Sequence, residues 1–172
     1  MLLDQQKSYA LRLPVLNAYV RDLKRRLRLG RRDLNICFVD DGAMRRINAA
    51  FRGKDQATDV LSFPWGEPHG SGRAAGPPKR PRRAPRRLAS LPRAGAEFAE
   101  FLGDIVISVE TARRNARAEG HSTLNEIRWL ILHGVLHLLG YDHERDSGEM
   151  TARELALREQ MAIARGRRSS RK

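Results

Sequence analysis

The sequence predicts an α/β fold, because four short apolar segments suited to β-strands are interspersed with five longer segments of helical periodicity. The clearest strand is residues 104–109, whose near-continuous apolar run is typical of a central strand covered on both faces. The clearest helix is residues 123–139, which are apolar on most sides and therefore expected in the core. The chain has 172 residues, a length that fits one domain.

Residues 1–39 are expected to form strand, helix and strand. Residues 1–4 predict a short edge strand, and residues 34–39 predict a second strand because they are short and apolar. Between them, Pro14 suits the first turn of a helix, and Gly30 ends the apolar residues at helical spacing. The rest of this helix surface is basic, and we favour a solvated face over a stripe that faces RNA (Arg21, Lys24, Arg25, Arg26 and Arg28).

The middle of the chain continues the alternation. Asp40 or Asp41 is expected to cap a helix with three apolar residues on one side, namely Met44, Ile47 and Phe51. Residues 58–64 predict a strand that Pro64 stops, and residues 110–119 predict a helix that closes at Gly120.

Two further helices complete the prediction. The apolar helix begins at Ser122 or Thr123, and Thr123 with Glu126 has the spacing of a capping box. The last helix is expected over about residues 147–164.

The positive charge is concentrated in two segments. The net charge is +13, yet residues 66–95 hold eight Lys or Arg against one acid, and residues 165–172 hold five and no acid. The remaining chain is therefore close to neutral, at +1. Basic arms of this kind suit a polyanion, and nucleic acid is the leading candidate. The alternative is that the segments are solvated and bind nothing specifically.

Composition also predicts the domain organisation. Residues 66–98 are rich in Pro and Arg, without periodicity, and are expected to form a flexible insertion in a single domain that spans residues 1–164. Residues 165–172 are expected to be a disordered basic tail. The first 20 residues lack the apolar run of a signal peptide and no segment is long enough to span a bilayer, so we expect a cytoplasmic protein that binds no membrane.

Three of the five histidines lie within residues 133–143. His133 and His137 share one face of a helix, Gly140 permits the helix to stop, and the chain beyond it can bring His143 back toward the same ion. Three imidazoles with a fourth position open to water are typical of a catalytic zinc site. We favour a single zinc ion, although nickel or cobalt would suit the same donors. The single cysteine, Cys37, is expected to be a buried thiol, the alternative being a fourth ligand.

The spacing of these histidines is that of the metzincin proteases, with one difference. Those proteases carry the glutamate general base directly after the first histidine, where this chain has Gly134. Glycine can neither accept nor donate a proton, so the pattern favours a metal site without protease activity.

The segment HGVLHLLGYDH, residues 133–143, resembles the signature of the YbeY family of bacterial endoribonucleases and ribosomal RNA maturation factors. Three more segments resemble that family: NAAFRGKD (48–55), TDVLSFP (58–64) and LGDIVIS (102–108). Residues 120–122 and Glu126 also match, so the resemblance covers roughly residues 34–164. The insertion after Pro64 departs from it.

The resemblance implies an α/β fold of the α+β kind, with a small mixed sheet of about four strands surrounded by about five helices. It implies a zinc ion held by His133, His137 and His143 on a buried helix, with Arg52 acting beside the metal. It implies a zinc-dependent, single-strand-specific endoribonuclease that acts in 3′-end maturation of 16S ribosomal RNA and in ribosome quality control. The expected partners are ribosomal RNA, the small ribosomal subunit, ribosomal proteins and a ribosome-associated GTPase.

Several residues receive roles in this hypothesis. Arg52 is expected to hold the phosphate, because a guanidinium can donate paired hydrogen bonds to it, and His133 is expected to be catalytic as a ligand. Asp142 either orients a histidine or caps a turn, and His121 is expected to be structural. The expected RNA-binding residues are Lys54, Arg80, Arg82, Arg83, Arg86 and Arg87. The alternative function is a non-catalytic ribosome-assembly factor in which zinc mainly supports the fold.

Overall fold

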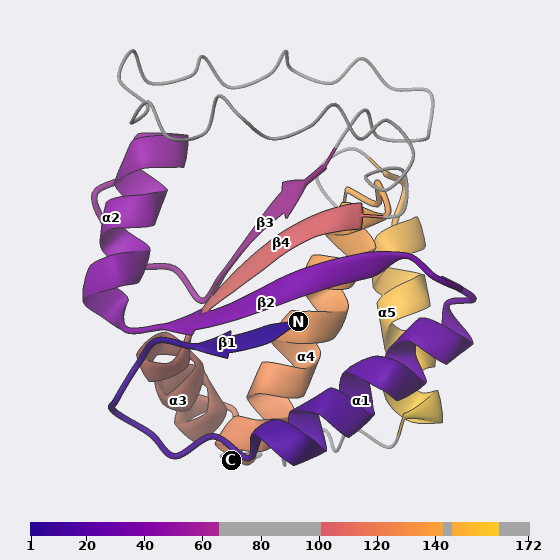
Figure 1. Cartoon of the computed structure of the whole chain (residues 1–172), viewed down its shortest axis with the longest axis horizontal. Coiled ribbons are helices and arrows are strands. Elements are labelled where there is room, and N and C mark those ends of the chain that lie inside the picture. Colours follow the sequence, from indigo (N-terminus) through magenta and orange to yellow (C-terminus); the bar gives the residue numbers. More distant parts are fainter. Residues whose placement is uncertain (66–100, 143–145, 162–172) are drawn as a thin grey trace, which may run out of the picture.

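The computed structural model describes residues 1–65, 101–142 and 146–161, which form one mixed four-stranded sheet with five helices (Figure 1). The strands are β1 (Leu2–Asp4), β2 (Asp33–Val39), β3 (Val60–Pro64) and β4 (Phe101–Ser108). The helices are α1 (Leu13–Arg26), α2 (Asp41–Arg52), α3 (Val109–Ala118), α4 (Thr123–Leu138) and α5 (Glu149–Gln160). The α/β class and the four strands predicted from the sequence are confirmed.

The strand order is β1-β2-β4-β3, so β4 is central, as its apolar run predicted. β1, β2 and β4 run parallel, and β3 is antiparallel to β4. Asp33 pairs with Phe101, and Pro64 pairs with Gly103. β2 and β4 therefore begin, and β3 ends, at the same end of the sheet, which we call the Pro64 end.

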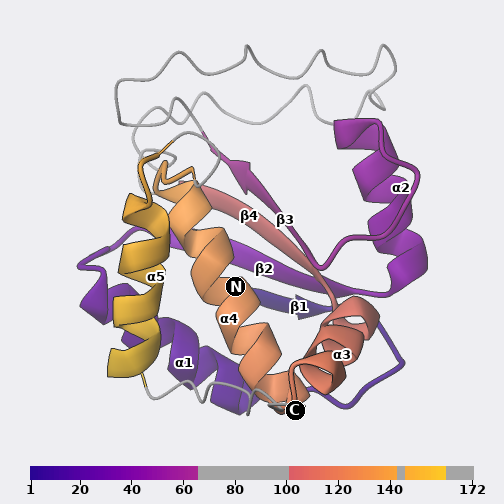
Figure 2. The same cartoon turned by 180° about the vertical axis from the view of Figure 1, so that it is seen from behind.

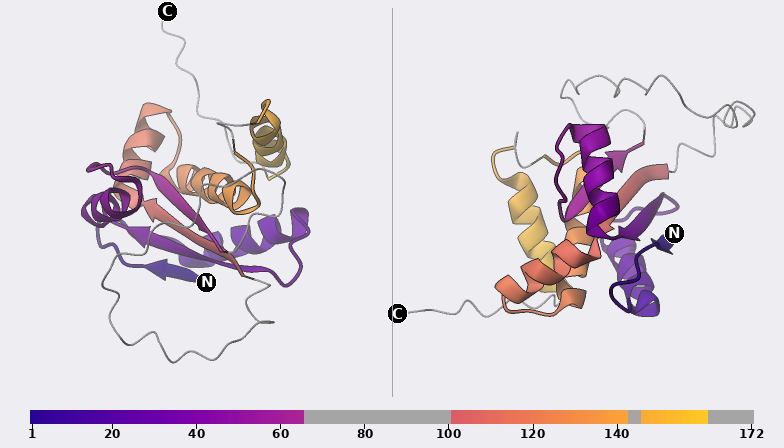
Figure 3. Two further views of the ribbon diagram at one scale, coloured as in Figure 1. Left: turned by 90° about the horizontal axis from the view of Figure 1, so that it is seen from above. Right: turned by 90° about the vertical axis from the view of Figure 1, so that its left-hand side faces the viewer.

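The two faces of the sheet are covered unequally. α1, α4 and α5 lie over one face (Figure 2), where Ile36, Phe38, Ile105 and Ile107 of the strands join the main core. The other face carries a smaller cluster around Val39, Met44 and Leu61, to which α2 contributes. α2 and α5 lie at opposite sides of the molecule (Figure 3).

Helix α2 begins where the sequence predicts, but its last turn differs. The Asp40 carboxylate accepts the N–H of Ala43 at 2.7 Å, and Gly53 closes the helix with φ of 69°. Phe51 was expected on the buried side with Met44, yet its side chain is 57% exposed. Phe63 of β3 packs edge-on against the Phe51 ring, and the other residues that the structure describes leave most of this side chain in solvent.

Helix α4 is capped differently from the prediction. The Ser122 hydroxyl accepts the N–H of Asn125 at 3.2 Å, so Ser122 is the N-cap. The predicted capping box of Thr123 with Glu126 is wrong, because the Glu126 side chain turns inward to His121. Gly140 follows the end of α4 with φ of 90°, in agreement with its predicted role.

The outer helices also shift from their predicted bounds. α1 ends at Arg26, and its cap is Leu27, earlier than the predicted Gly30. α5 starts at Glu149, directly after its cap residue Gly148. The predicted end of α5 beyond Met161, the insertion at 66–98 and the tail at 165–172 lie outside the described residues. No described helix has the length and apolar character needed to cross a membrane.

Candidate functional site

Helix α4 places His133 and His137 one turn apart on the same face. Their Nε2 atoms are 3.1 Å apart, their ring centroids are 4.7 Å apart, and the ring planes meet at 76°. Both side chains are partly exposed, whereas residues 130–132 and 134–136 of the same helix are buried. The two histidines therefore lie on one face of a helix, as their spacing predicted, and the other sides of this helix are buried in the core.

Gly134 explains how α4 lies so close to the sheet. A Cβ atom on Gly134 would lie 2.9 Å from Cγ2 of Ile105 and 3.1 Å from Oγ of Ser62. The Ser62 hydroxyl also donates to the Gly134 carbonyl at 3.4 Å. A side chain at position 134 would thus point into β3 and β4 instead of toward the imidazoles. Close packing of α4 on the sheet therefore favours glycine at position 134, and as a result the chain has no glutamate base there.

Glu154 of α5 lies behind His133, with its Oε1 atom 3.6 Å from Nδ1 of the imidazole. The indole Nε1 of Trp129 donates to the same carboxylate oxygen, and the Arg158 guanidinium lies 3.3 Å from the Trp129 ring centroid. Burial acts to raise the pKa of Glu154, but His133, Trp129 and Arg158 outweigh it and hold this pKa below its usual value. Glu154 is therefore a charged partner that orients His133.

The histidine pair fits a metal ion. Two nitrogen ligands about 2.0–2.1 Å from one tetrahedral zinc lie about 3.3 Å apart, close to the observed 3.1 Å. A carboxylate behind one imidazole, as Glu154 provides, is the usual companion of a metal-bound histidine. Within residues 1–65, 101–142 and 146–161, no cluster of three or more His, Cys, Asp or Glu has metal-binding geometry. The predicted third ligand, His143, lies outside these ranges.

Cys37 is not placed to be the fourth ligand. It belongs to the small cluster on the face of the sheet that α2 covers, whereas α4 packs on the opposite face. Burial raises the pKa of the Cys37 thiol, which disfavours the thiolate that a metal needs. The sequence predicted a buried thiol, and the structure shows one that is only partly buried.

Arg52 is the last residue of α2 and is exposed. No hydrogen bond or ion pair of its side chain occurs within the described residues. Its neighbour Phe51 packs edge-on against Phe63 of β3, with ring centroids 4.9 Å apart. Phe63 precedes Pro64, so the C-terminus of α2 lies near the Pro64 end of the sheet, although no direct contact links Arg52 to the histidines.

The loop after α2 is held firmly. The Arg45 guanidinium donates two hydrogen bonds of 2.6 Å to the two carboxylate oxygens of Asp55. The Asn48 side chain, which is buried, donates to the Gln56 carbonyl at 2.8 Å. Lys54, a predicted RNA-binding residue, is exposed on this loop.

Two exposed aromatic side chains near this end of the sheet were missed by the sequence reasoning. Phe51 is 57% exposed and Trp65 is 56% exposed. The Trp65 ring packs edge-on against Phe101, with centroids 6.0 Å apart. Large aromatic rings left in solvent beside an arginine would have been a usable signal, but helical spacing assigned Phe51 to the core.

His121 has the structural role that the sequence predicted. Its Nε2 lies 3.0 Å from Oε2 of Glu126, and both side chains are about 5% exposed or less. Asp59 and Asn115 are close by, with the Asn115 amide donating to Asp59 at 3.3 Å. Burial raises the pKa of Glu126, and the charges of His121 and Arg158 only partly offset this.

The remaining predicted residues are not tested by the geometry. The backbone carbonyl of Asp142 accepts the N–H of Asp146 at 2.9 Å, a bond that tests neither of the two roles predicted for the Asp142 side chain. The predicted RNA-binding arginines of the insertion lie outside the described residues, namely Arg80, Arg82, Arg83, Arg86 and Arg87.

Comparison with known proteins identifies the family of the chain. The model of the family described as Endoribonuclease YbeY matches residues 4–162. A protein of that name from Nautilia profundicola is 42% identical over 123 residues, which cover 72% of this chain and 68% of the relative. One from Aquifex aeolicus is 39% identical, over 68% of this chain and 60% of the relative. One from Bacillus mycoides is 38% identical, over 77% and 75%.

A solved structure supports the fold alone. The solution structure of a Thermotoga maritima protein matches with a TM-score of 0.57 and 22% identity, over 94% of this chain and 89% of that protein. At this identity the match indicates a shared arrangement of strands and helices and says nothing about activity.

Proposed function

The chain belongs to the YbeY family, and from this membership we propose that it is an endoribonuclease whose active site contains His133 and His137. The observation that carries the proposal is the 3.1 Å separation of the two Nε2 atoms, with Glu154 behind His133. Two converging imidazoles oriented by a buried carboxylate are a metal-binding arrangement, and the relatives' names supply the reaction.

We propose that the site holds one zinc ion through His133, His137 and His143. A bound Zn²⁺ would supply a Lewis acid and a water with a pKa of about 7, and hence a nucleophile at neutral pH. The chain contributes rigidity, because α4 is fixed in the core. Glu154 holds the His133 ring with its Nε2 atom directed away from α5. Gly134 provides no general base, so no side chain at this position can relay a proton.

Arg52 is proposed to bind the scissile phosphate. Its guanidinium is exposed and uncommitted within the described residues, so it can donate two hydrogen bonds to one phosphate. The negative charge that develops at phosphorus in the transition state strengthens these bonds. Lys54, on the loop that the Arg45–Asp55 pair holds, supplies a second cation nearby.

The proposed substrate is single-stranded ribosomal RNA, and the proposed partner is the small ribosomal subunit. Exposed Phe51 and Trp65 support a single strand, because only unpaired bases can stack on a protein ring. The net charge of +13 supports a polyanion. We propose that processing of the 16S 3′ end is the reaction performed, on the strength of the family resemblance.

The test is cleavage of a labelled single-stranded RNA by four proteins: wild type, His133→Ala, Arg52→Ala and the control Arg117→Ala, which removes an exposed cation of α3. We expect the first two substitutions each to lower the cleavage rate by about 100-fold or more, since removing one charge-stabilising donor costs 10²–10³-fold. The Arg117 control should cleave as wild type does. Equal cleavage by all four proteins would disprove the proposal.

The non-catalytic alternative makes a separate prediction. If zinc served only the fold, its removal by a chelator would lower the melting temperature, and no purified preparation would cleave RNA. Because α4 is buried in the core, we expect a bound ion to stabilise the fold under either hypothesis. Cleavage that depends on Arg52, a residue remote from the core, separates the two functions.

The basic insertion is proposed to assist RNA binding. Deletion of residues 66–95 should weaken binding and flatten its dependence on salt, because fewer counterions would be released from the RNA. An unchanged salt slope would show that the insertion does not contact RNA.

A further inference from the structure

Helix α1 and the loop that follows it concentrate positive charge on the folded part of the protein. Residues 21–33 contain seven Lys or Arg and two Asp, a net charge of +5 in 13 residues. The chain outside the basic insertion and tail has a net charge of only +1, so acidic residues elsewhere balance this segment. The charge of the folded part is therefore strongly uneven.

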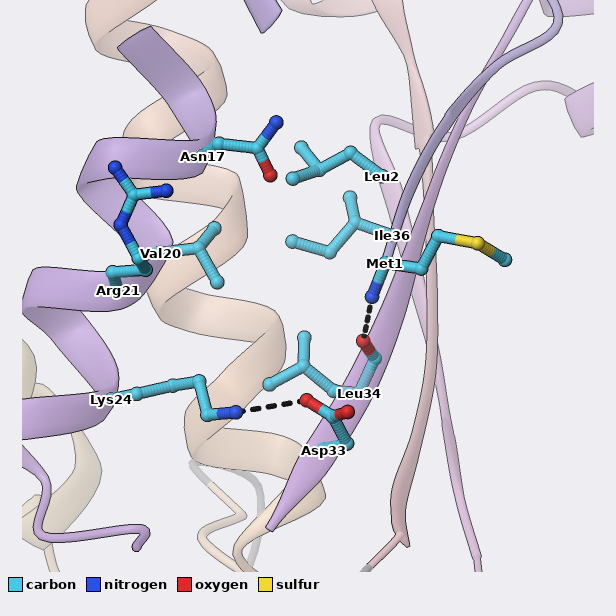
Figure 4. A pocket seen from close by; sticks show the side chains of 9 residues that line it. All are labelled: Met1, Leu2, Asn17, Val20, Arg21, Lys24, Asp33, Leu34 and Ile36. Carbon is cyan, nitrogen blue, oxygen red and sulfur yellow. Dashed lines mark hydrogen bonds and ion pairs between the residues drawn. The ribbon is translucent and has the colours of Figure 1, made fainter. Parts of the chain in front are cut away.

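Only part of this charge is neutralised by ion pairs. Asp22 accepts hydrogen bonds from Arg25 at 2.7 Å and Arg26 at 2.9 Å, so two cations share one acid. Asp33 accepts a hydrogen bond from Lys24 at 2.8 Å (Figure 4).

Arg21, Arg28 and Arg32 take part in none of these ion pairs, and we call these three arginines the α1 basic surface. All three are exposed, and none has an acidic partner among the residues that the structure describes. Arg21 borders a cavity of about 150 Å³ between α1 and the strands, and its guanidinium points away from them (Figure 4).

The backbone holds Arg28 in a defined place. Its φ is 53°, a left-handed conformation that glycine adopts without strain and arginine rarely adopts. Its N–H donates to the Arg25 carbonyl at 3.1 Å, and the next N–H donates to the Lys24 carbonyl at 3.0 Å. Arg28 therefore lies in the turn that closes α1, and its side chain is attached to an ordered backbone.

The α1 basic surface reaches the same end of the sheet as the histidine pair. Arg32 directly precedes β2, whose first residue Asp33 pairs with Phe101 at the start of β4. At this end, Gly103 of β4 packs against Leu138, the last residue of α4. Figure 1 shows the α1–β2 connection and the last turn of α4 at this end.

We propose that the α1 basic surface binds backbone phosphates of an RNA strand on one side of the linkage held at His133 and His137. This inference rests on the proposed function and extends it from one phosphate to a strand. Arg21 lies on α1, and Arg28 lies in the turn that follows the helix, more than one helical turn further along the chain, which suits separate phosphates of one strand. Arginine is suited to this role because its guanidinium binds phosphate through paired hydrogen bonds.

The experiment compares two triple variants with equal loss of charge. The test variant is Arg21→Gln/Arg28→Gln/Arg32→Gln. The control is Lys7→Gln/Arg12→Gln/Arg117→Gln, which removes three exposed cations outside the Pro64 end. Each is made in a His133→Ala background, so that the RNA stays intact, and circular dichroism verifies folding. Fluorescence anisotropy measures binding of unstructured RNAs of 6 and 24 nucleotides over a range of NaCl concentrations.

We expect the test variant to bind the 24-nucleotide RNA at least tenfold more weakly than its parent. Its slope of log K against log salt should fall by about 2, because each single-strand phosphate contributes about 0.7. The control should retain most of the slope, and both variants should bind the 6-nucleotide RNA as the parent does. Equal slopes for the two variants would overturn the proposal. Anisotropy with labelled polyglutamate tests the other polyanion: if the test variant lost binding to polyglutamate but bound RNA as its parent does, the proposal would be overturned in favour of an acidic protein partner.

Cleavage separates this inference from the proposed function. With His133 restored, the test variant should still cleave the 6-nucleotide RNA at the wild-type rate. If wild type cleaves no RNA while the salt slopes differ as expected, the proposed nuclease function fails and the binding surface stands. If cleavage is normal and the slopes are equal, only the binding surface fails.

Discussion

Gly134 of α4 and Ile105 of β4 approach so closely that a Cβ atom on the glycine would lie 2.9 Å from Cγ2 of the isoleucine. Carbon atoms in proteins pack at about 3.5–4.0 Å, so no side chain fits between this helix and the sheet. The histidine that precedes Gly134 is thus carried on a part of α4 that rests directly on β4.

The substitution Gly134→Ala should destabilise the fold. Alanine gains about 1 kcal/mol of helix propensity over glycine, but overpacking of a filled core costs about 1–3 kcal/mol. We expect a net loss of about 1 kcal/mol and a decrease in melting temperature of about 2–4 °C. Gly42→Ala in α2 is the control, because its Cβ would meet no atom closer than 3.3 Å. Equal melting temperatures for the two variants would contradict the prediction.

A double-mutant cycle can attribute this cost to Ile105. Ile105→Val removes the Cδ1 atom, which would lie 3.0 Å from the new methyl group. The penalty of Gly134→Ala should therefore be smaller in the Ile105→Val background than in wild type, as measured by urea unfolding. If the effects of the two substitutions on the free energy of unfolding were strictly additive, the strain would not arise from the contact with Cδ1 of Ile105.

Glu154→Gln should weaken metal binding without unfolding the protein. The glutamine retains the shape of the side chain but removes the negative charge beside His133, and loss of such an outer partner typically lowers metal affinity 10–100-fold. Competition with a chromogenic chelator measures the zinc affinity. Glu159→Gln removes an exposed charge from the same helix and should leave the affinity unchanged. Wild-type affinity in Glu154→Gln would mean that the carboxylate does not orient the ligand.

The buried Glu126 predicts a specific dependence of stability on pH. Burial raises the pKa of Glu126 above its usual 4.5, so the folded state retains a proton that the unfolded state releases. The stability that Glu126 contributes is therefore complete below pH 4.5 and is lost as pH rises through the folded pKa. His121, Arg158 and Asp59 face this carboxylate and modulate the shift.

Glu126→Gln should remove this dependence. In urea titrations, the free energy of unfolding of the variant should increase relative to that of wild type as pH rises from 4.5 to 7.5. Glu119→Gln, at an exposed position, should follow wild type throughout. Parallel curves for wild type and Glu126→Gln would show that Glu126 titrates as it does in the unfolded chain.

Phe51→Ala should weaken binding of single-stranded RNA. Stacking of one base on an aromatic ring contributes about 1–3 kcal/mol, so we expect a 5- to 100-fold rise in KM with a smaller change in kcat. Phe51→Tyr retains the ring and should bind as wild type does. Leu3→Ala removes an exposed apolar side chain of β1 and should have no effect. If Phe51→Ala and Leu3→Ala have equal KM values, no base stacks on Phe51.

The sequence predicted the features that depend on local pattern. The central position of β4 followed from its apolar run, and the end of α4 followed from Gly140. The pairing of His133 with His137 followed from one helical turn of spacing. Each of these depends on residues close together in the chain.

The contacts that depend on packing between distant elements could not be predicted. Glu154 is 21 residues from His133, and their contact exists only because α5 packs against α4. Phe51 has the helical spacing of a core residue, but within the described residues the packing of α2 leaves its side chain 57% exposed. Likewise, the sequence did not indicate which carboxylates would form ion pairs with the basic residues of α1.

The pairing of β3 with β4 makes the length of their connection nearly irrelevant to the fold. The Trp65 N–H donates to the Leu102 carbonyl at 2.9 Å, so the chain leaves the sheet and re-enters it between adjacent strands. Closing a connection of 35 residues, even fully unfolded, costs only about 2 kcal/mol more entropy than closing one of four. This position is therefore suited to protein engineering: a reporter domain or an affinity tag could be inserted there with the sheet register intact.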